Sequence, residues 1–127
     1  MVEDAERDGA VTLRVEQKGY VRCDWRRGTR ITGALARSSI KRLDELNEGT
    51  ERPLLVDMRG TASLTREGRQ AFAERYSASK VALLGESPVD RVIANFTLSV
   101  ITMSIPTRYF TSEPAALAWL IGDDART

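Results

Sequence analysis

The chain has 127 residues, enough for one compact domain whose core needs no disulfide or metal to hold it together. Its 42% hydrophobic and 29% charged residues exclude a disordered chain. The absence of histidine argues against zinc hydrolysis and against Ser-His or Cys-His catalysis. A single cysteine, Cys23, excludes an internal disulfide, and the acidic N-terminus is unlike a signal peptide, so we expect a cytoplasmic protein.

The first part of the chain predicts a β-hairpin followed by a helix. Residues 11–17 alternate apolar and polar side chains, as a half-buried strand does. A second strand begins at Tyr20, after a turn at Lys18 and Gly19. Residues 33–48 carry apolar side chains at helical spacing, and Gly49 is a natural helix end.

The remainder of the chain alternates between apolar strands and helices. The expected elements are a strand over residues 54–58, a helix over 66–77, a strand over 80–85, an uncharged helix over 92–107, a strand over 107–110 and a helix over 114–121. Such alternation favours parallel strand pairing. We therefore predict a single α/β domain over residues 1–127, with an N-terminal β-hairpin, then βαβαβα, a mixed central sheet and about four helices. The termini, 1–9 and 122–127, should be frayed.

The segment 54–68 is the strongest candidate for a functional site. An apolar strand ends at Asp57, and a short polar loop leads to a helix start at Thr65. Ligands of open α/β sheets usually lie at such strand ends, beside helix N-termini. Asp57 and Glu67 are the only acidic pair that we expect to face one site, although both are also ordinary structural choices. The candidate partner- or ligand-binding residues are Asp57, Ser63, Thr65, Arg66 and Glu67.

No sequence motif identifies an enzyme. Phosphate-binding loops, nucleophile elbows and metal-ligand spacings are missing, so we expect no catalytic residue, no metal and no cofactor. The segment YSASK spaces Tyr76 and Lys80 as in the Tyr-x-x-x-Lys motif of short-chain dehydrogenases, which needs both on one helix face. The helix should end near Tyr76, and Lys80 should open a strand. We therefore expect Tyr76 in the core and no dehydrogenase activity.

The uncharged stretch 92–107 is unusual, because a helix on a sheet normally has a charged outer side. It is too short and too interrupted by polar residues to span a bilayer. A partner subunit or an apolar ligand could cover it, or it could simply pack between the sheet and neighbouring helices. Its candidate interface or ligand residues are Val92, Ile93, Phe96, Val100 and Met103.

The section from Arg14 to Arg42 is rich in arginine and lysine, with Glu16 and Asp24 as its acidic residues. A solvated surface explains it, and an anionic partner is the alternative. Trp25 among arginines is similar to a single-stranded nucleic-acid site, but such sites stack bases on several aromatic rings. We therefore expect Trp25 to pack against the sheet and nucleic-acid binding to be the weaker interpretation.

Three segments resemble parts of STAS domains, specifically the SpoIIAA-like proteins of bacteria: LLVDMRG (54–60), KVALLG (80–85) and RYFTSEPAALAWL (108–120). The resemblance implies a STAS-type fold. In anti-anti-sigma members, the helix that follows the strand of the LLVDMRG segment begins with Asp-Ser-Ser-Gly, and a kinase phosphorylates a serine there. With Gly68 placed on the motif glycine, Arg66 and Glu67 replace the two serines. The phosphorylation switch is therefore not expected here.

Together these features predict a non-enzymatic regulatory or docking domain that binds an unknown protein partner and can form a homodimer. Arg66 is the best single pointer to a ligand, because a cation at a helix N-terminus is unfavourable unless an anion or acidic group binds it. The first alternative is a carrier of a small apolar or lipid-like ligand against residues 92–103, as in the related CRAL-TRIO folds. The second is anion or nucleic-acid binding through residues 14–42.

Overall fold

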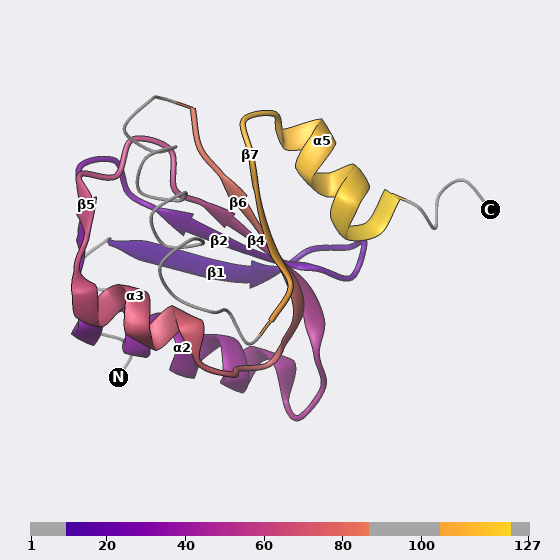
Figure 1. The fold of residues 1–127 in the computed structure, drawn as a ribbon. Coiled ribbons are helices and arrows are strands. Elements are labelled where there is room, and N and C mark those ends of the chain that lie inside the picture. Colours follow the sequence, from indigo (N-terminus) through magenta and orange to yellow (C-terminus); the bar gives the residue numbers. More distant parts are fainter. Residues whose placement is uncertain (1–9, 87–104, 123–127) are drawn as a thin grey trace.

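The computed structural model describes residues 10–86 and 105–122 (Figure 1). A five-stranded sheet of order β1-β2-β4-β6-β7 forms its centre. Its strands are β1 (Val11–Val15), β2 (Val21–Trp25), β4 (Arg52–Asp57), β6 (Ala78–Leu84) and β7 (Thr107–Phe110). β1 and β2 pair antiparallel, and the other neighbours pair parallel. The predicted mixed sheet that opens with a hairpin is confirmed.

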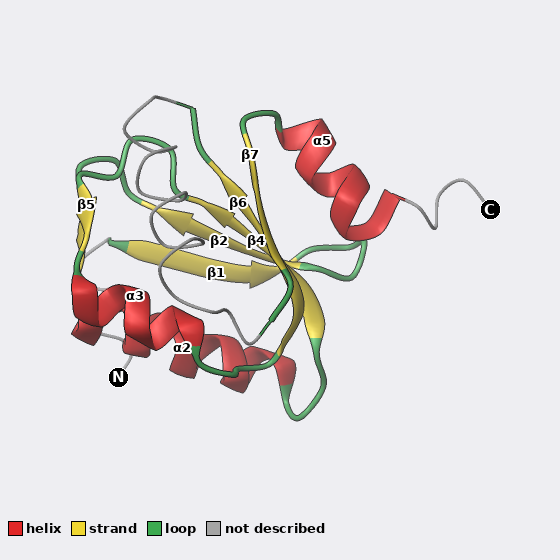
Figure 2. Ribbon diagram, in the orientation of Figure 1, coloured by secondary structure: helices red, strands yellow, loops and turns green. Residues whose placement is uncertain are grey.

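Helices cover both faces of this sheet (Figure 2). α2 (Gly33–Asn47) and α3 (Arg66–Ala73) lie on one face, and α5 (Glu113–Leu117), continued by the π-helical turn η1 (Ala118–Gly122), lies on the other. Successive strand side chains point to opposite faces. Leu54 therefore packs in the core under α2 and α3, whereas Leu55 packs under α5. We call these the α2/α3 face and the α5 face.

Capping side chains fix the starts of the helices. The Thr32 hydroxyl accepts a hydrogen bond from the Leu35 amide (3.2 Å), and Thr65 accepts one from the Gly68 amide (3.1 Å). Ser112 caps α5 in the same way, through the Ala115 amide at 3.3 Å. Each cap satisfies an amide that has no partner within the helix. The helix start predicted at Thr65 is confirmed.

The end of α3 differs from the prediction. The helix stops at Ala73 rather than near residue 77. Ser77 is held instead by α2: Asp44 Oδ1 accepts from its amide (3.1 Å) and hydroxyl (2.7 Å), and Asn47 Nδ2 donates to its carbonyl at 2.5 Å. These tertiary hydrogen bonds draw the chain away from the helix axis, and β6 begins already at Ala78.

The described residues contain three helices, α2, α3 and α5, rather than about four. The helix predicted over 92–107, with its candidate residues Val92, Ile93, Phe96, Val100 and Met103, lies outside the described residues. A second difference is a small parallel sheet of two strands, β3 (Arg30–Ile31) and β5 (Ser63–Leu64), which the sequence did not predict. Strands of two residues are too short to show any periodicity.

Candidate functional site

Two loops meet at the edge where the parallel strands end. β2, β4, β6 and β7 finish on the same side of the sheet, and the segments 26–33 and 58–67 follow the first two. Backbone hydrogen bonds join these segments at Gly28 N–Gly60 O (2.8 Å), Ala62 N–Thr29 O (2.9 Å) and Thr65 N–Ile31 O (3.0 Å). The β3–β5 pair lies between them. We call the surface of these two segments the edge surface.

The starts of α2 and α3 pack closely beneath the edge surface. A Cβ atom at Gly33 would come within 2.7 Å of the Glu67 Cβ, and one at Gly68 within 2.8 Å of the Ile31 carbonyl. Only glycine fits at such distances. The buried Gly68 aligns with the motif glycine of the STAS resemblance, so a packing requirement accounts for it.

Four of the five candidate residues of segment 54–68 lie on the edge surface. Arg66 and Glu67 are exposed in the first turn of α3, and the Thr65 hydroxyl is engaged as the helix cap. Ser63 is half-buried beside Arg30, its pairing partner in the small sheet.

The prediction that Asp57 and Glu67 face one site is wrong. In β4 its side chain alternates with that of Val56, whose side chain packs in the core under α2 and α3. Asp57 therefore points to the α5 face, where it meets Arg22 of β2 and, beyond it, Glu113 of α5. Glu67 lies on α3, across the sheet.

A charged network surrounds Asp57 on the α5 face. Arg22 donates to Asp24 Oδ1 (2.8 Å), Asp57 Oδ2 (2.9 Å) and Glu113 Oε2 (2.9 Å). Arg59 donates twice to Asp57, from Nε at 2.8 Å and from Nη2 at 2.6 Å. Only 12% of the Arg22 side chain and 13% of the Asp57 side chain are exposed. The sequence analysis did not predict this network. Its one signal in the sequence was that Arg22 and Asp24 alternate with buried residues along β2.

The network keeps its groups charged. Burial alone would raise the pKa of Asp57, but the hydrogen bonds and charge of Arg59, with that of Arg22, hold it below its ordinary value. Burial alone would lower the pKa of Arg22, yet the carboxylates of Glu113 and Asp24 raise it. A general base works best with a pKa near the operating pH. The network is therefore suited to fastening α5 onto the sheet rather than to proton transfer.

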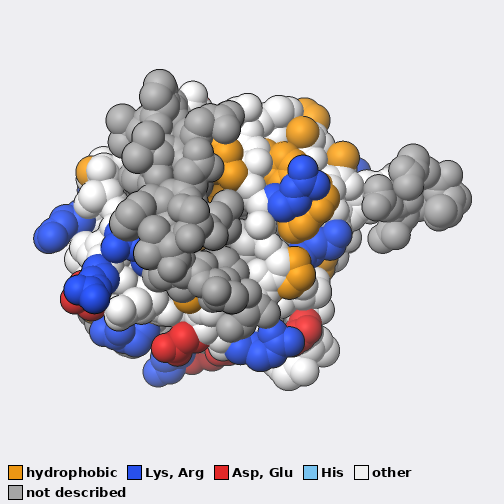
Figure 3. Space-filling view, in the orientation of Figure 1, with side chains coloured by type: hydrophobic (Ala, Val, Ile, Leu, Met, Phe, Trp, Pro, Cys, Tyr) orange, Lys and Arg blue, Asp and Glu red, His pale blue; other side chains and the backbone are white. Residues whose placement is uncertain are grey.

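Three exposed arginines near the starts of α2 and α3 lack carboxylate partners among the described residues. Within the part of the chain that the structure describes, the guanidinium groups of Arg30, Arg37 and Arg66 form no ion pair or hydrogen bond. By contrast, Arg27 is paired with Glu86. Figure 3 shows basic side chains gathered on the side where β5 and the start of α3 lie.

The basic section 14–42 does not form one face. Arg14 and Arg22 pair with Glu16, Asp24, Asp57 and Glu113 near the α5 face, while Arg37 and Lys41 lie on α2, across the sheet. Trp25 is 5% exposed and belongs to the core, as expected. It cannot stack on a nucleic-acid base.

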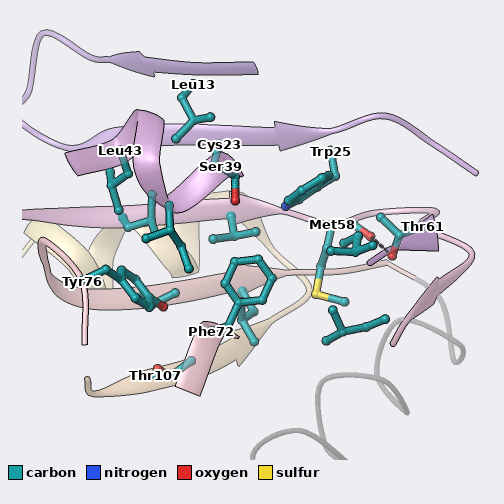
Figure 4. A pocket seen from close by; sticks show the side chains of 17 residues that line it. Leu13, Cys23, Trp25, Ser39, Leu43, Met58, Thr61, Phe72, Tyr76 and Thr107 are labelled. Atoms are coloured by element: carbon teal, nitrogen blue, oxygen red, sulfur yellow. Dashed lines mark hydrogen bonds between the residues drawn. The ribbon is translucent and has the colours of Figure 1, made fainter. Parts of the chain in front are cut away.

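An apolar cavity of about 60 Å³ lies between the sheet, α2 and α3 (Figure 4). Leu13 of β1, Leu43 of α2 and Phe72 of α3 point into it. Tyr76 also lines it, whereas Lys80 lies on the opposite face with its ammonium on the Trp119 carbonyl (2.8 Å). Burial raises the pKa of Tyr76. The YSASK segment therefore does not form a dehydrogenase pair.

The described residues contain no cluster of His, Cys, Asp and Glu able to hold a metal ion. Among the same residues, no helix has the length and apolar character needed to cross a membrane.

One of two similar solved structures supports the fold. An uncharacterised protein of the DUF3478 family from Shewanella loihica PV-4, described as having a SpoIIAA-like fold, matches with a TM-score of 0.59. It is 15% identical, and the match covers 87% of this chain and 92% of that one. A protein of unknown function from Arthrobacter sp. fb24 is 44% identical, over 86% of this chain and 97% of that one, with a TM-score of 0.37.

The STAS resemblance thus holds at the level of a SpoIIAA-like fold. No curated protein matches the chain. A family model matches residues 14–122, which include every described strand from β2 onward and all the described helices. The chain belongs to the family that this model describes, a domain of unknown function (DUF7793).

Proposed function

We propose that the chain is a non-enzymatic docking domain that binds another protein through the edge surface. The observation that carries the proposal is that this surface is both exposed and preformed. Three backbone hydrogen bonds and the β3–β5 pair join its two segments. Binding to such a surface costs little ordering entropy, which favours recognition by a protein partner.

The position of the edge surface also supports docking. It lies at the carboxyl ends of parallel strands, which is where α/β domains usually bind. The SpoIIAA-like fold supports a regulatory role by analogy alone. Asp57 supports the non-enzymatic part, because two arginines already occupy it and its lowered pKa disfavours work as a base near neutral pH.

Site-specific photocrosslinking tests the proposal. A photoreactive amino acid replaces the exposed Ala62 in the centre of the edge surface, and the control places it at the exposed Lys41 on α2. We expect Ala62 to capture a defined protein in the cells that make the chain, and Lys41 not to capture it. In a pull-down without crosslinker, the same protein should co-purify with the wild-type chain and not with the Ala62→Trp variant, whose bulky ring blocks the surface. Equal capture from both positions, or none from Ala62, contradicts the proposal.

The cavity on the α2/α3 face favours a second candidate, the carrier of a small apolar ligand. Its lining is almost entirely apolar. Its volume of about 60 Å³, however, is well below the roughly 150 Å³ at which an engineered cavity binds benzene. A lipid-like ligand would have to open the core. Docking is therefore the better-supported function.

Native mass spectrometry of freshly purified protein separates the two candidates. Docking predicts the mass of the chain alone or of a multiple of it. A co-purifying small molecule that persists in the Ala62→Trp variant would favour the carrier instead.

A further inference from the structure

We propose that the edge surface recognises an acidic segment of its protein partner. This inference rests on the proposed docking function and adds the chemistry of the partner. Its basis is a cluster of three exposed arginines, Arg30, Arg37 and Arg66, which have no ion pair or hydrogen bond within the described residues.

Three different elements bring these arginines together. Arg30 lies on β3 and pairs in register with Ser63, three residues before Arg66. The Arg37 guanidinium folds back along α2, so that its Nη1 lies 3.3 Å from where a Gly33 Cβ would be. That same position is 2.7 Å from the Cβ of Glu67, the residue after Arg66. The cluster therefore spans the junction of β3, α2 and α3.

Two of the three cations stand where the fold itself disfavours them. The backbone amides at a helix N-terminus carry partial positive charge, which attracts anions and repels cations. Arg66 occupies the first turn of α3, and the Arg37 guanidinium lies against the first residue of α2, whose first turn contains no acidic residue. Carboxylates of a bound partner would turn both unfavourable placements into charge-assisted hydrogen bonds.

The edge surface has little negative charge of its own to neutralise the cluster. Its two segments, 26–33 and 58–67, contain five arginines, Arg26, Arg27, Arg30, Arg59 and Arg66, and a single acidic residue, Glu67. Among residues 10–86 and 105–122, the carboxylates that meet the arginines of this surface from outside its two segments are already engaged, since Glu86 pairs with Arg27 and Asp57 with Arg59. Figure 3 shows this basic character on the side that carries β5.

The cluster leads into a groove between α2 and α3. The groove has a volume of about 210 Å³, and its lining residues are Arg37, Ile40, Glu67, Gln70, Ala71, Glu74 and Arg75. Its carboxylates, Glu67 and Glu74, would repel a continuous polyanion, but its apolar residues Ile40 and Ala71, together with Arg37, suit a peptide with local acidic groups. A partner segment could place carboxylates on the cluster and an apolar side chain in the groove.

The chemistry of the edge surface favours protein over nucleic acid. Segments 26–33 and 58–67 contain no aromatic residue, and Trp25, the aromatic residue next to them, is buried in the core. Single-stranded nucleic-acid sites depend on aromatic stacking platforms as well as on positive charge. An arginine cluster without such a platform matches carboxylates better.

A peptide titration tests the inference. The probes are a fluorescent glutamate-rich peptide, the same peptide with glutamine in place of glutamate, and an oligothymidine of similar length. Amide NMR shifts locate binding, and fluorescence anisotropy measures it at several salt concentrations. We expect the glutamate peptide alone to bind, to shift amides in segments 26–33 and 58–67, and to weaken steeply as salt rises.

Charge reversal supplies the matched variants. Arg30→Glu with Arg66→Glu should weaken the glutamate peptide by roughly tenfold or more, since like charges then oppose it. Arg30→Lys with Arg66→Lys should restore much of the affinity. Lys41→Glu removes a cation of α2 about 12 Å along the helix from Gly33 and should change the affinity less than twofold. Thermal unfolding checks that each variant remains folded.

Three results would overturn the inference: failure of the glutamate peptide to bind, shifts that map outside the edge surface, or tighter binding of oligothymidine. Failure here is distinguishable from failure of the docking function. If Ala62 still crosslinks a protein whose capture is unchanged by charge reversal and by salt, docking stands and the acidic segment is wrong.

Discussion

Arginines near the carboxyl ends of the parallel strands differ in burial and in hydrogen bonding between the two faces of the sheet. On the α5 face, Arg22 and Arg59 are part-buried and hydrogen-bonded to carboxylates from three elements of the structure. Across the sheet, Arg30 and Arg66 are exposed, with no ion pair in the described part of the chain. The same residue type therefore has two uses here, which burial and partners separate and composition does not.

This contrast predicts two kinds of mutational effect. A part-buried, fully paired arginine should affect the free energy of unfolding, because its removal leaves carboxylates without partners. An exposed, unpaired arginine should affect binding and leave folding nearly unchanged.

Arg22→Met should cost roughly 3 kcal/mol of folding free energy, because methionine keeps the aliphatic stem but leaves Glu113 and Asp57 short of a partner. Urea denaturation measures the loss. The control is Arg14→Met on the adjacent strand, where 59% of the arginine side chain is exposed and a loss below about 1 kcal/mol is expected. Equal losses in the two variants would show that the Arg22 network does not stabilise the fold.

Gly68→Ala should cost about 1–3 kcal/mol, since the new methyl group would lie 2.8 Å from the Ile31 carbonyl, a backbone atom that cannot rotate away. This change tests the packing beneath the edge surface rather than its charge. Gln70→Ala, at an exposed position of α3, should be close to neutral. A neutral Gly68→Ala would mean that α3 can shift relative to β3.

Asp57→Asn should flatten the acid side of the stability profile. The pKa of Asp57 is lowered in the folded state, so the unfolded chain binds more protons in acid. The stabilisation is therefore complete above the unfolded pKa of about 4 and is lost as the pH falls through the folded pKa. Urea denaturation from neutral pH downward should show a smaller acid loss for Asp57→Asn than for the wild type. Identical slopes would remove Asp57 as a source of the pH dependence.

Arg30→Ser and Arg66→Ser should each change the free energy of unfolding by less than about 0.5 kcal/mol. Either variant should nevertheless weaken binding of the glutamate-rich peptide. A loss of stability above about 1 kcal/mol would contradict this contrast, because it would show that these arginines also stabilise the fold.

Local sequence patterns predicted most of the elements. Alternation along residues 11–15, the continuous apolar run of β4 and the capping hydroxyls of Thr65 and Ser112 each act within a few residues, so they are visible in the sequence. The strand end and the helix start within segment 54–68 were also predicted correctly, since a strand end followed by a capped helix is a local signal. The proposed roles of its residues remain predictions.

Which side chains meet depends on contacts between distant parts of the chain, and local sequence patterns do not show these contacts. The Arg22–Glu113 pair joins residues 91 positions apart, and the two-residue strands β3 and β5 pair only because the rest of the fold holds their loops together. Asp57 and Glu67 lie on opposite faces because the phase of β4 in the sheet, fixed by core packing, sets the direction of the carboxylate. Local patterns therefore predicted the helices and the strands of the main sheet to within a few residues, while long-range packing set which arginines are paired within the described residues and which are exposed without a partner there.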